Sequence, residues 1–484
     1  MQEENNNSKT NCNKIDRRDF IKIIGGGATA GVIGLTTASL ISSCDSKKDA
    51  NAFGEIPTDK MTYRTSKSND EISLLGYGCM RFPLREKEDG TEEIDQDIVN
   101  ELTDYAIAHG VNVFDTSPRY IRGWSETAMG IALSRHPRDK YFVMTKLSNQ
   151  AENPEIRSRE GSIAMYHKSL KDLQVDCIDY YLIHSVGSGK PILNRNPEEG
   201  AIGAVKERIF DNGMLDFLLE EKKAGRIRNL GWSFHGDVEV FDYMLEMHDE
   251  GVAIWDFAMI QLNYIDWKYA SGRNINANYL YGELEKRNIP AVIMSPLLGS
   301  RLANLPKHLA AQLKQLRPTE SIASWAFRFA GSPPGIATVF TGMREMEHLQ
   351  DNLRTFSDFE ELTVEENKLL SEIADQIMAS SSIPCTACNY CVPCPYGIDI
   401  VGIITHYNKL LAAEEIAEST QDPNYRKAKQ AFLVGYDRAV PKLRQAGHCI
   451  HCEQCIPACP QKLDIPLELM KIHNYAESLR QGRL

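Results

Sequence analysis

Short apolar runs alternate with segments of helical periodicity between about residues 71 and 355. Runs of roughly four to eight apolar residues are expected for strands that are buried on both faces. The predicted strands are residues 72–79, 111–116, 141–146, 177–184, 227–233, 257–263, 291–295 and 337–341.

Amphipathic helices are predicted between these strands. Ile98, Leu102 and Tyr105 lie on one helical face, and Ser125 is expected to cap a helix over residues 126–135. Eight strand–helix repeats predict an α/β fold of the (β/α)8 TIM-barrel type, which typically takes about 250 residues. The alternative is a doubly wound sheet, which is less favoured because no G-x-G-x-x-G motif follows the first strand.

Length and net charge limit the number of domains and the class of partner to expect. A chain of 484 residues with 42% apolar residues suits two or three globular domains. The formal net charge is −12 and no basic stripe is present, so no nucleic-acid partner is expected.

The first 44 residues have the pattern of an export signal. Arg17 and Arg18 precede an uncharged apolar stretch at residues 23–41, which ends shortly before Cys44. Paired arginines before such a stretch resemble a twin-arginine signal, and Ile-Ser-Ser-Cys resembles a bacterial lipobox, in which Cys44 would be lipidated. The alternative is an uncleaved spanning helix, since the stretch is near the minimum length of roughly 17 residues. We expect a periplasmic or membrane-anchored bacterial lipoprotein, held to the membrane only by its lipid, with a flexible tether at residues 45–70.

Eight of the 12 cysteines form two motifs near the C-terminus. The first motif is Cys385, Cys388, Cys391 and Cys394, and the second is Cys449, Cys452, Cys455 and Cys459; a proline follows each. Thiolates are the ligands that iron–sulfur clusters require, so the motifs predict two [4Fe–4S] clusters. Paired structural zinc sites, which also use C-x2-C spacing, are the alternative.

The second motif matches a bacterial run whose fourth cysteine ligates the other cluster in two-cluster ferredoxins. We therefore expect one cluster at Cys385, Cys388, Cys391 and Cys459, and the other at Cys449, Cys452, Cys455 and Cys394. Helices are predicted at residues 363–379, 408–417 and 425–437. These features predict a barrel at residues 71–360, a connecting helix within residues 361–380, and a mainly α-helical ferredoxin-like domain at residues 381–484.

Four polar residues lie at or just after successive predicted strand ends. They are Asp115, Tyr120, Lys146 and His184. In a (β/α)8 barrel such positions share one mouth. A lysine beside the phenol is expected to lower the tyrosine pKa from about 10, an aspartate to hold the lysine, and a histidine to orient a carbonyl oxygen. Each residue alone has an ordinary structural explanation, but their joint arrangement predicts an active site.

This quartet and its spacing resemble the aldo/keto reductase family over about residues 70–355. The resemblance implies NADP(H)-linked reduction of aldehydes or ketones, or the reverse oxidation of alcohols. It also implies that Tyr120 is the general acid, that Lys146 and Asp115 tune it, and that His184 orients the carbonyl.

Three further segments resemble the nucleotide-binding segments of that family: residues 260–264, residues 295–299 (Ser-Pro-Leu-Leu-Gly) and residues 342–352. The implied contacts are Ser233, Gln261, Ser295, Leu297, Gly299, Gly342, Met343, His348, Asp351 and Asn352. Two positions depart from the family pattern: Phe234 follows Ser233 in place of the usual asparagine, and His348 replaces an arginine. NADP(H) and NAD(H) both stay open for this reason.

These features predict an exported oxidoreductase that acts on a small carbonyl or alcohol, with two clusters that relay electrons to or from a redox partner protein. A hydride carries two electrons whereas a cluster passes one, and no flavin motif is evident to convert between them. The alternative is an iron–sulfur electron-transfer or redox-sensing protein whose barrel is a scaffold.

Overall fold

The computed structural model describes residues 55–269, 276–379 and 382–484. Ile56–Leu484 forms one compact unit. The expected export signal with Cys44 lies outside the described residues, as does the first part of the expected tether, residues 45–54. Within the described ranges, no helix is long and apolar enough to cross a membrane.

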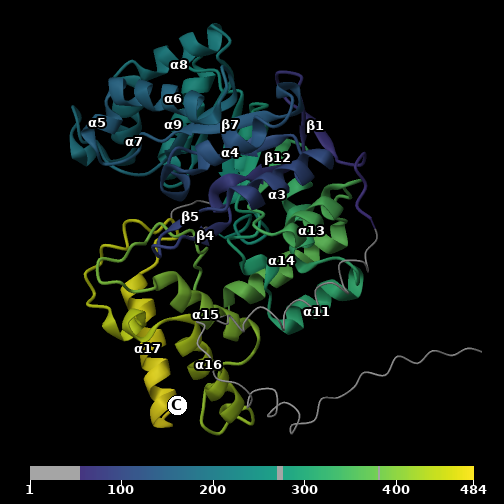
Figure 1. Cartoon of the computed structure of the whole chain (residues 1–484), viewed down its shortest axis with the longest axis vertical. Coiled ribbons are helices and arrows are strands. Elements are labelled where there is room, and N and C mark those ends of the chain that lie inside the picture. The colour runs from purple at the N-terminus through teal and green to yellow at the C-terminus, as the bar shows by residue number, and fades with distance from the viewer. Residues whose placement is uncertain (1–54, 270–275, 380–381) are drawn as a thin grey trace, which may run out of the picture. The chain divides into compact units, whose positions relative to one another are not determined.

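Eight parallel strands close into a barrel, which confirms the predicted fold class (Figure 1). Their order around the barrel is β3 (Leu75–Gly78), β6 (Val113–Asp115), β7 (Phe142–Leu147), β8 (Ile178–Val186), β9 (Ile227–Phe234), β10 (Phe257–Gln261), β11 (Ala291–Met294) and β12 (Ile336–Thr341). Nearly every strand residue is buried, because one strand face fills the barrel and the other packs on helices. The apolar runs of the sequence reflect this two-sided burial.

Helices occupy the connections between these strands. The longer ones are α3 (Gln96–Ala108), α4 (Ser125–Leu133), α6 (Arg159–Leu173), α8 (Met214–Lys223), α9 (Val238–Asp249), α10 (Ala277–Lys286), α11 (Lys307–Leu316), α12 (Ile322–Gly331) and α13 (Met346–Phe356). The prediction that Ser125 caps α4 is wrong, since Trp124 occupies the N-cap. Ser125 is buried in the first turn, and its hydroxyl donates to the Cys79 carbonyl at 2.8 Å, which ties α4 to the end of β3.

Part of the segment expected to be a tether is instead packed. β1 (Tyr63–Thr65) pairs with β2 (Glu71–Ser73) in an antiparallel ladder. Ile56 and Met61, which precede β1, are buried in the core of the barrel. Apolar residues in an otherwise polar stretch account for this difference from the sequence prediction.

The C-terminal part is mainly helical. It follows α14 (Val364–Ala379) and contains α15 (Ile400–Ala412), α16 (Tyr425–Ala439) and α17 (Ile465–Gln481), which pack on one another (Figure 1). The prediction of a helix over residues 408–417 is wrong in its bounds: Asp399 caps α15 by accepting from the Gly402 amide at 3.0 Å. Asp464 caps α17, which was not predicted, by accepting from the Leu467 amide at 3.1 Å.

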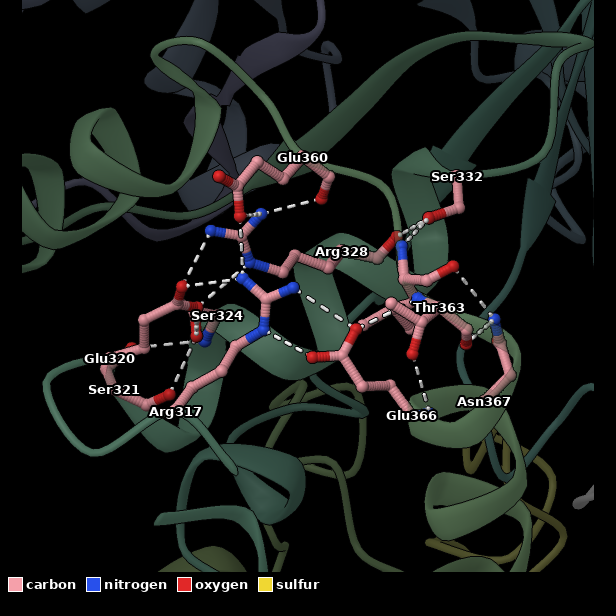
Figure 2. A network of polar contacts seen from close by, with 11 residues as sticks. Arg317, Glu320, Ser321, Ser324, Arg328, Ser332, Glu360, Thr363, Glu366 and Asn367 are labelled. Atoms are coloured by element: carbon pink, nitrogen blue, oxygen red, sulfur yellow. Dashed lines mark hydrogen bonds and ion pairs between the residues drawn. The ribbon is translucent and has the colours of Figure 1, made fainter. Parts of the chain in front are cut away.

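An arginine–glutamate network joins the start of α14 to the barrel helices (Figure 2). Arg317 binds both carboxylate oxygens of Glu366, with nitrogen–oxygen distances of 2.6 and 3.1 Å. It also binds Glu320 and Glu360, each at 2.9 Å. Arg328 binds both oxygens of Glu320 at 2.9 Å. Such bidentate pairs fix the orientation of both partners, so this network sets where the chain leaves the barrel.

Replacing Arg317 with alanine is expected to lower the free energy of unfolding by about 2–4 kcal/mol, because several carboxylates lose their partner.

The bond from Arg317 holds the pKa of Glu366 below its ordinary value. A carboxyl with a depressed folded-state pKa stabilises the fold above its unfolded pKa of about 4.3, and this contribution is lost as the pH falls through the folded value. Urea unfolding at neutral pH and at about pH 4 measures both effects. The exposed Arg85, which pairs with Glu93 at 2.8 Å, is the matched control, and R85A is expected to cost far less stability than R317A because water screens the exposed pair. Equal effects of R317A and R85A would contradict the prediction.

Candidate active site and cluster-binding segments

The four predicted catalytic residues come together at one end of the barrel. Asp115 ends β6, and Lys146 and His184 lie near the ends of the neighbouring strands β7 and β8. The Lys146 ammonium forms a buried ion pair with Asp115 and donates to the Thr116 carbonyl at 2.8 Å. It lies 4.9 Å from the centre of the Tyr120 ring, and that ring meets the His184 ring edge to face at 6.1 Å. The side chains therefore share one mouth.

The electrostatics of the quartet differ in one respect from the sequence prediction. Burial raises the pKa of Asp115 and lowers that of Lys146, and their ion pair opposes both shifts. Burial, followed by the Asp115 charge, raises the pKa of Tyr120 well above its ordinary value. The net shift is opposite to the lowering expected from Lys146, because burial of the phenol is the largest cause. The phenol stays protonated at neutral pH, as a proton donor must.

Two serines that the sequence analysis missed hold His184. The Ser148 hydroxyl lies 2.6 Å from His184 Nδ1, and the Ser117 hydroxyl lies 3.4 Å from the same atom. Burial, followed by the Lys146 charge, lowers the pKa of His184 well below its ordinary value, so the imidazole is neutral. With Nδ1 engaged, Nε2 is the nitrogen left for a substrate oxygen. The available signal was positional, since each serine follows a strand end.

A buried arginine supports the end of β8. Arg208 donates to the carbonyl of His184 at 3.1 Å and to Asn149 Oδ1 at 2.7 Å. Burial lowers its pKa to about 9. No local pattern indicated this role, because Arg208 lies in the long connection between β8 and α8.

Two predicted contacts on the nicotinamide side are buried and already engaged by the protein. The Ser233 hydroxyl accepts from the Ser185 amide at 2.8 Å. The Gln261 amide donates to Asp266 at 2.5 Å, and the same carboxylate accepts from Asn263 at 2.7 Å. These residues shape the floor of the mouth, and Gln261 would have to share its amide with any ligand.

The segment expected to bind phosphate follows β11. Ser295, Leu298 and Gly299 all have positive φ angles, and Leu297 is half-buried. The chain itself covers Gly299: a β-carbon there would lie 2.4 Å from the carbonyl oxygen of Thr386. Only glycine allows this approach, so the outer side of the loop at Gly299 is filled by the first cysteine segment.

The segment expected to lie near the adenine follows β12. Met343 and Asn352 are buried, and the Met343 carbonyl accepts from Tyr77 at 2.7 Å. Gly342 and His348 are exposed, so they are the members of this set that can meet a ligand from solvent. Burial raises the pKa of Asp351. The residues present thus fit a hydride carrier at the quartet and on the β12 side, and fit it less well at Gly299.

The structure places the eight motif cysteines around two cavities. Cys385, Cys388, Cys391 and Cys459 line one cavity. Cys394, Cys449, Cys452 and Cys455 line the other, with Cys391 in the wall between them. The fourth cysteine of each motif therefore lies with the first three of the other motif, which is the arrangement expected for crossed ligation.

The donor chemistry of these cavities fits iron–sulfur clusters. Burial and neighbouring cysteines raise the pKa of Cys391 to about 12 and that of Cys455 to about 11. Thiols crowded in this way need a bound metal cation to exist as thiolates. In the parts of the chain that the structure describes, no three His, Cys, Asp or Glu side chains are grouped as ligands for a single metal ion.

Comparison with known proteins gives two family matches. The profile of the aldo/keto reductase family matches residues 74–375, and that of the 4Fe-4S dicluster domain matches residues 384–463. Protein tas of Escherichia coli (strain K12) is 29% identical over 204 residues, which are 39% of this chain and 56% of that protein. The chain thus spans little more than half the length of this relative. The uncharacterized oxidoreductase YqkF of Bacillus subtilis is 22% identical over 342 residues, which are 64% of this chain and 95% of that protein.

Solved structures resemble the barrel part. An aldo-keto reductase from Klebsiella pneumoniae in complex with NADPH is 17% identical, with a TM-score of 0.48 over 65% of this chain and 95% of that one. Aldo-keto reductase AKR11C1 from Bacillus halodurans, in its holo form, is 20% identical, with a TM-score of 0.46 over 65% of this chain and 96% of that one. The match over residues 74–375 takes in more than half of the chain, and the chain therefore belongs to the aldo/keto reductase family, with a 4Fe-4S domain after its barrel.

Proposed function

We propose that the protein interconverts a small aldehyde or ketone and the corresponding alcohol at the mouth of the barrel, with NADP(H) or NAD(H) as the hydride carrier. The observation that carries this proposal is the buried Lys146–Asp115 pair next to Tyr120, with His184 beside the same ring. Residues 295–299 and 342–352 would hold the nucleotide.

Each residue of the quartet has a separate task in this reaction. In the reducing direction, the Tyr120 hydroxyl donates its proton to the carbonyl oxygen, and His184 Nε2 orients that oxygen. The bound nicotinamide supplies the hydride for the carbonyl carbon. The Lys146 ammonium, held by Asp115, stabilises the phenolate that forms on Tyr120. Burial of the quartet strengthens this electrostatic support, because the pair is shielded from water.

We also propose two [4Fe–4S] clusters, one at each group of four cysteines, that exchange electrons with a redox partner protein. The partner would meet the protein after export, which the pattern around Arg17, Arg18 and Cys44 supports. A nucleotide used outside the cytoplasm would travel with the protein as a tightly bound group.

A second function is supported by two contacts that involve residues expected to bind the nucleotide. Thr386 covers Gly299, and the Gln261 amide is bound to Asp266. Both features favour an electron-transfer or redox-sensing protein whose barrel is a scaffold. Carbonyl turnover in a variant without the Tyr120 hydroxyl separates the two functions, because only the first requires that proton.

A further inference from the structure

An arginine of the barrel binds the first cysteine segment. Arg81 ends a short 3-10 helix, Cys79–Arg81, that directly follows β3. Its Nη2 donates to the carbonyl oxygens of Thr386 at 2.8 Å and Ala387 at 2.9 Å. Both acceptors lie between Cys385 and Cys388, so the guanidinium binds the backbone that carries two of the four thiols of the first cavity.

Two contacts from the far side of β12 hold the same segment. Arg301 Nη2 donates to the Ser382 hydroxyl at 3.0 Å, and Gly299 lies directly against Thr386. Arg301 and Gly299 follow β11, whereas Arg81 follows β3, and β12 lies between those strands in the barrel. The first segment therefore packs on the loops that follow β3 and β11, at the same end of the barrel as the quartet.

One side chain of this segment, Tyr390, interacts electrostatically with the quartet. Tyr390 lies between Cys388 and Cys391 in sequence and is 48% exposed. The charges of Cys388, Arg119 and Asp115 act on its phenol. Tyr390 in turn contributes to the raised pKa of Tyr120. A tyrosine of the cluster segment thus shares the electrostatic environment of the proposed proton donor.

The two cavities differ in their surrounding charge. Charges of Cys388 and Cys385 act on Arg81, and Cys385 also acts on Arg301, so both cations lie close to the first cavity. Glu453 is the charged residue that lines the second cavity, alongside cysteines and apolar groups. A cluster with four thiolates becomes more negative by one charge on reduction. Nearby cations therefore favour the reduced form of the first cluster over that of the second.

We propose that Arg81 is a positioning residue that docks the first cluster on the catalytic mouth and makes it the higher-potential cluster of the pair. This inference rests on the proposed cluster ligands, and it does not depend on carbonyl chemistry. It assigns different reduction potentials to the two clusters, with the higher one at the first cluster.

The test is a redox titration of anaerobically purified full-length protein, with electron paramagnetic resonance to follow each cluster. At a fixed solution potential, R81Q is expected to lower the ratio of reduced to oxidised first cluster by about tenfold or more, which is a shift of about 59 mV or more for one electron. R81K keeps the charge and is expected to retain most of the ratio. R444Q is the matched control, since Arg444 donates to the Gly397 carbonyl at 3.1 Å and binds backbone after Cys394 instead.

An R81Q protein that holds both clusters at unchanged potentials would overturn the proposal, and so would equal shifts of both clusters. If R81Q does not retain iron, R301Q takes its place: a smaller downward shift of the first cluster alone is expected, and no shift would overturn the proposal. Shifted potentials together with absent carbonyl turnover would leave this inference standing and refute the proposed function.

Discussion

Replacing Tyr120 with phenylalanine is expected to lower carbonyl turnover by about 10²–10⁴-fold while both clusters remain in place. The substitution removes one oxygen atom and keeps the ring that contacts Lys146 and His184. The other members of the quartet are already committed, since Asp115 is bound to Lys146 and His184 is neutral with Nδ1 engaged. The loss is measured with either nucleotide and a panel of small aldehydes and ketones under anaerobic conditions.

The pH profile of the unmodified protein gives an independent check on this role. The pKa of Tyr120 is raised well above about 10, and the pKa of His184 is lowered well below about 6.5. The phenol is thus protonated and the imidazole neutral between about pH 7 and 9, so kcat/KM for carbonyl reduction is expected to be flat there. Tyr105 lies in α3 and stacks on His109. It provides the matched control, and Y105F is expected to keep full turnover. Turnover by Y120F equal to that of Y105F would show that Tyr120 is not the proton donor.

Replacing Cys459 with alanine is expected to remove the first cluster and leave the second, although Cys459 lies in the second motif. The reason is its position, because Cys459 lines the cavity of Cys385, Cys388 and Cys391. About half of the iron should be lost, and the remaining cluster should keep its potential. Iron analysis together with electron paramagnetic resonance measures both quantities.

The reciprocal variant and a thiol control complete this experiment. Cys394 lines the other cavity, so C394A is expected to remove the second cluster. Cys177 is a half-buried thiol outside both motifs, and C177A is expected to keep all the iron. If C459A lost the second cluster instead, each motif would ligate its own cluster and the crossed arrangement would be wrong.

The sequence was sufficient for the barrel and the quartet because both follow from local patterns. Two-sided burial makes each strand an apolar run, and parallel strands bring their carboxyl ends to one mouth, so Asp115, Lys146 and His184 could be placed together in advance. Cysteine spacing likewise indicated the cluster segments, since x2 spacing lets successive thiolates reach one cluster.

Features that depend on distant contacts could not be predicted in this way. Arg81 bonds to a carbonyl 305 residues away, and no local pattern marks such a pair. The direction of the Tyr120 pKa shift follows from its burial, which composition and spacing do not give. The start of α15 is a different case, because Asp399 before an apolar run was a readable capping signal.

The central claim is that the barrel is a working hydride-transfer site, and its most direct test is the release of nucleotide. Full-length protein would be purified anaerobically and denatured, and the supernatant assayed for NADP(H) and NAD(H). We expect close to one nicotinamide nucleotide per chain, bound at the quartet and along residues 342–352. No released nucleotide, together with no binding of added NADPH or NADH, would contradict the claim and leave the barrel as a scaffold for the clusters.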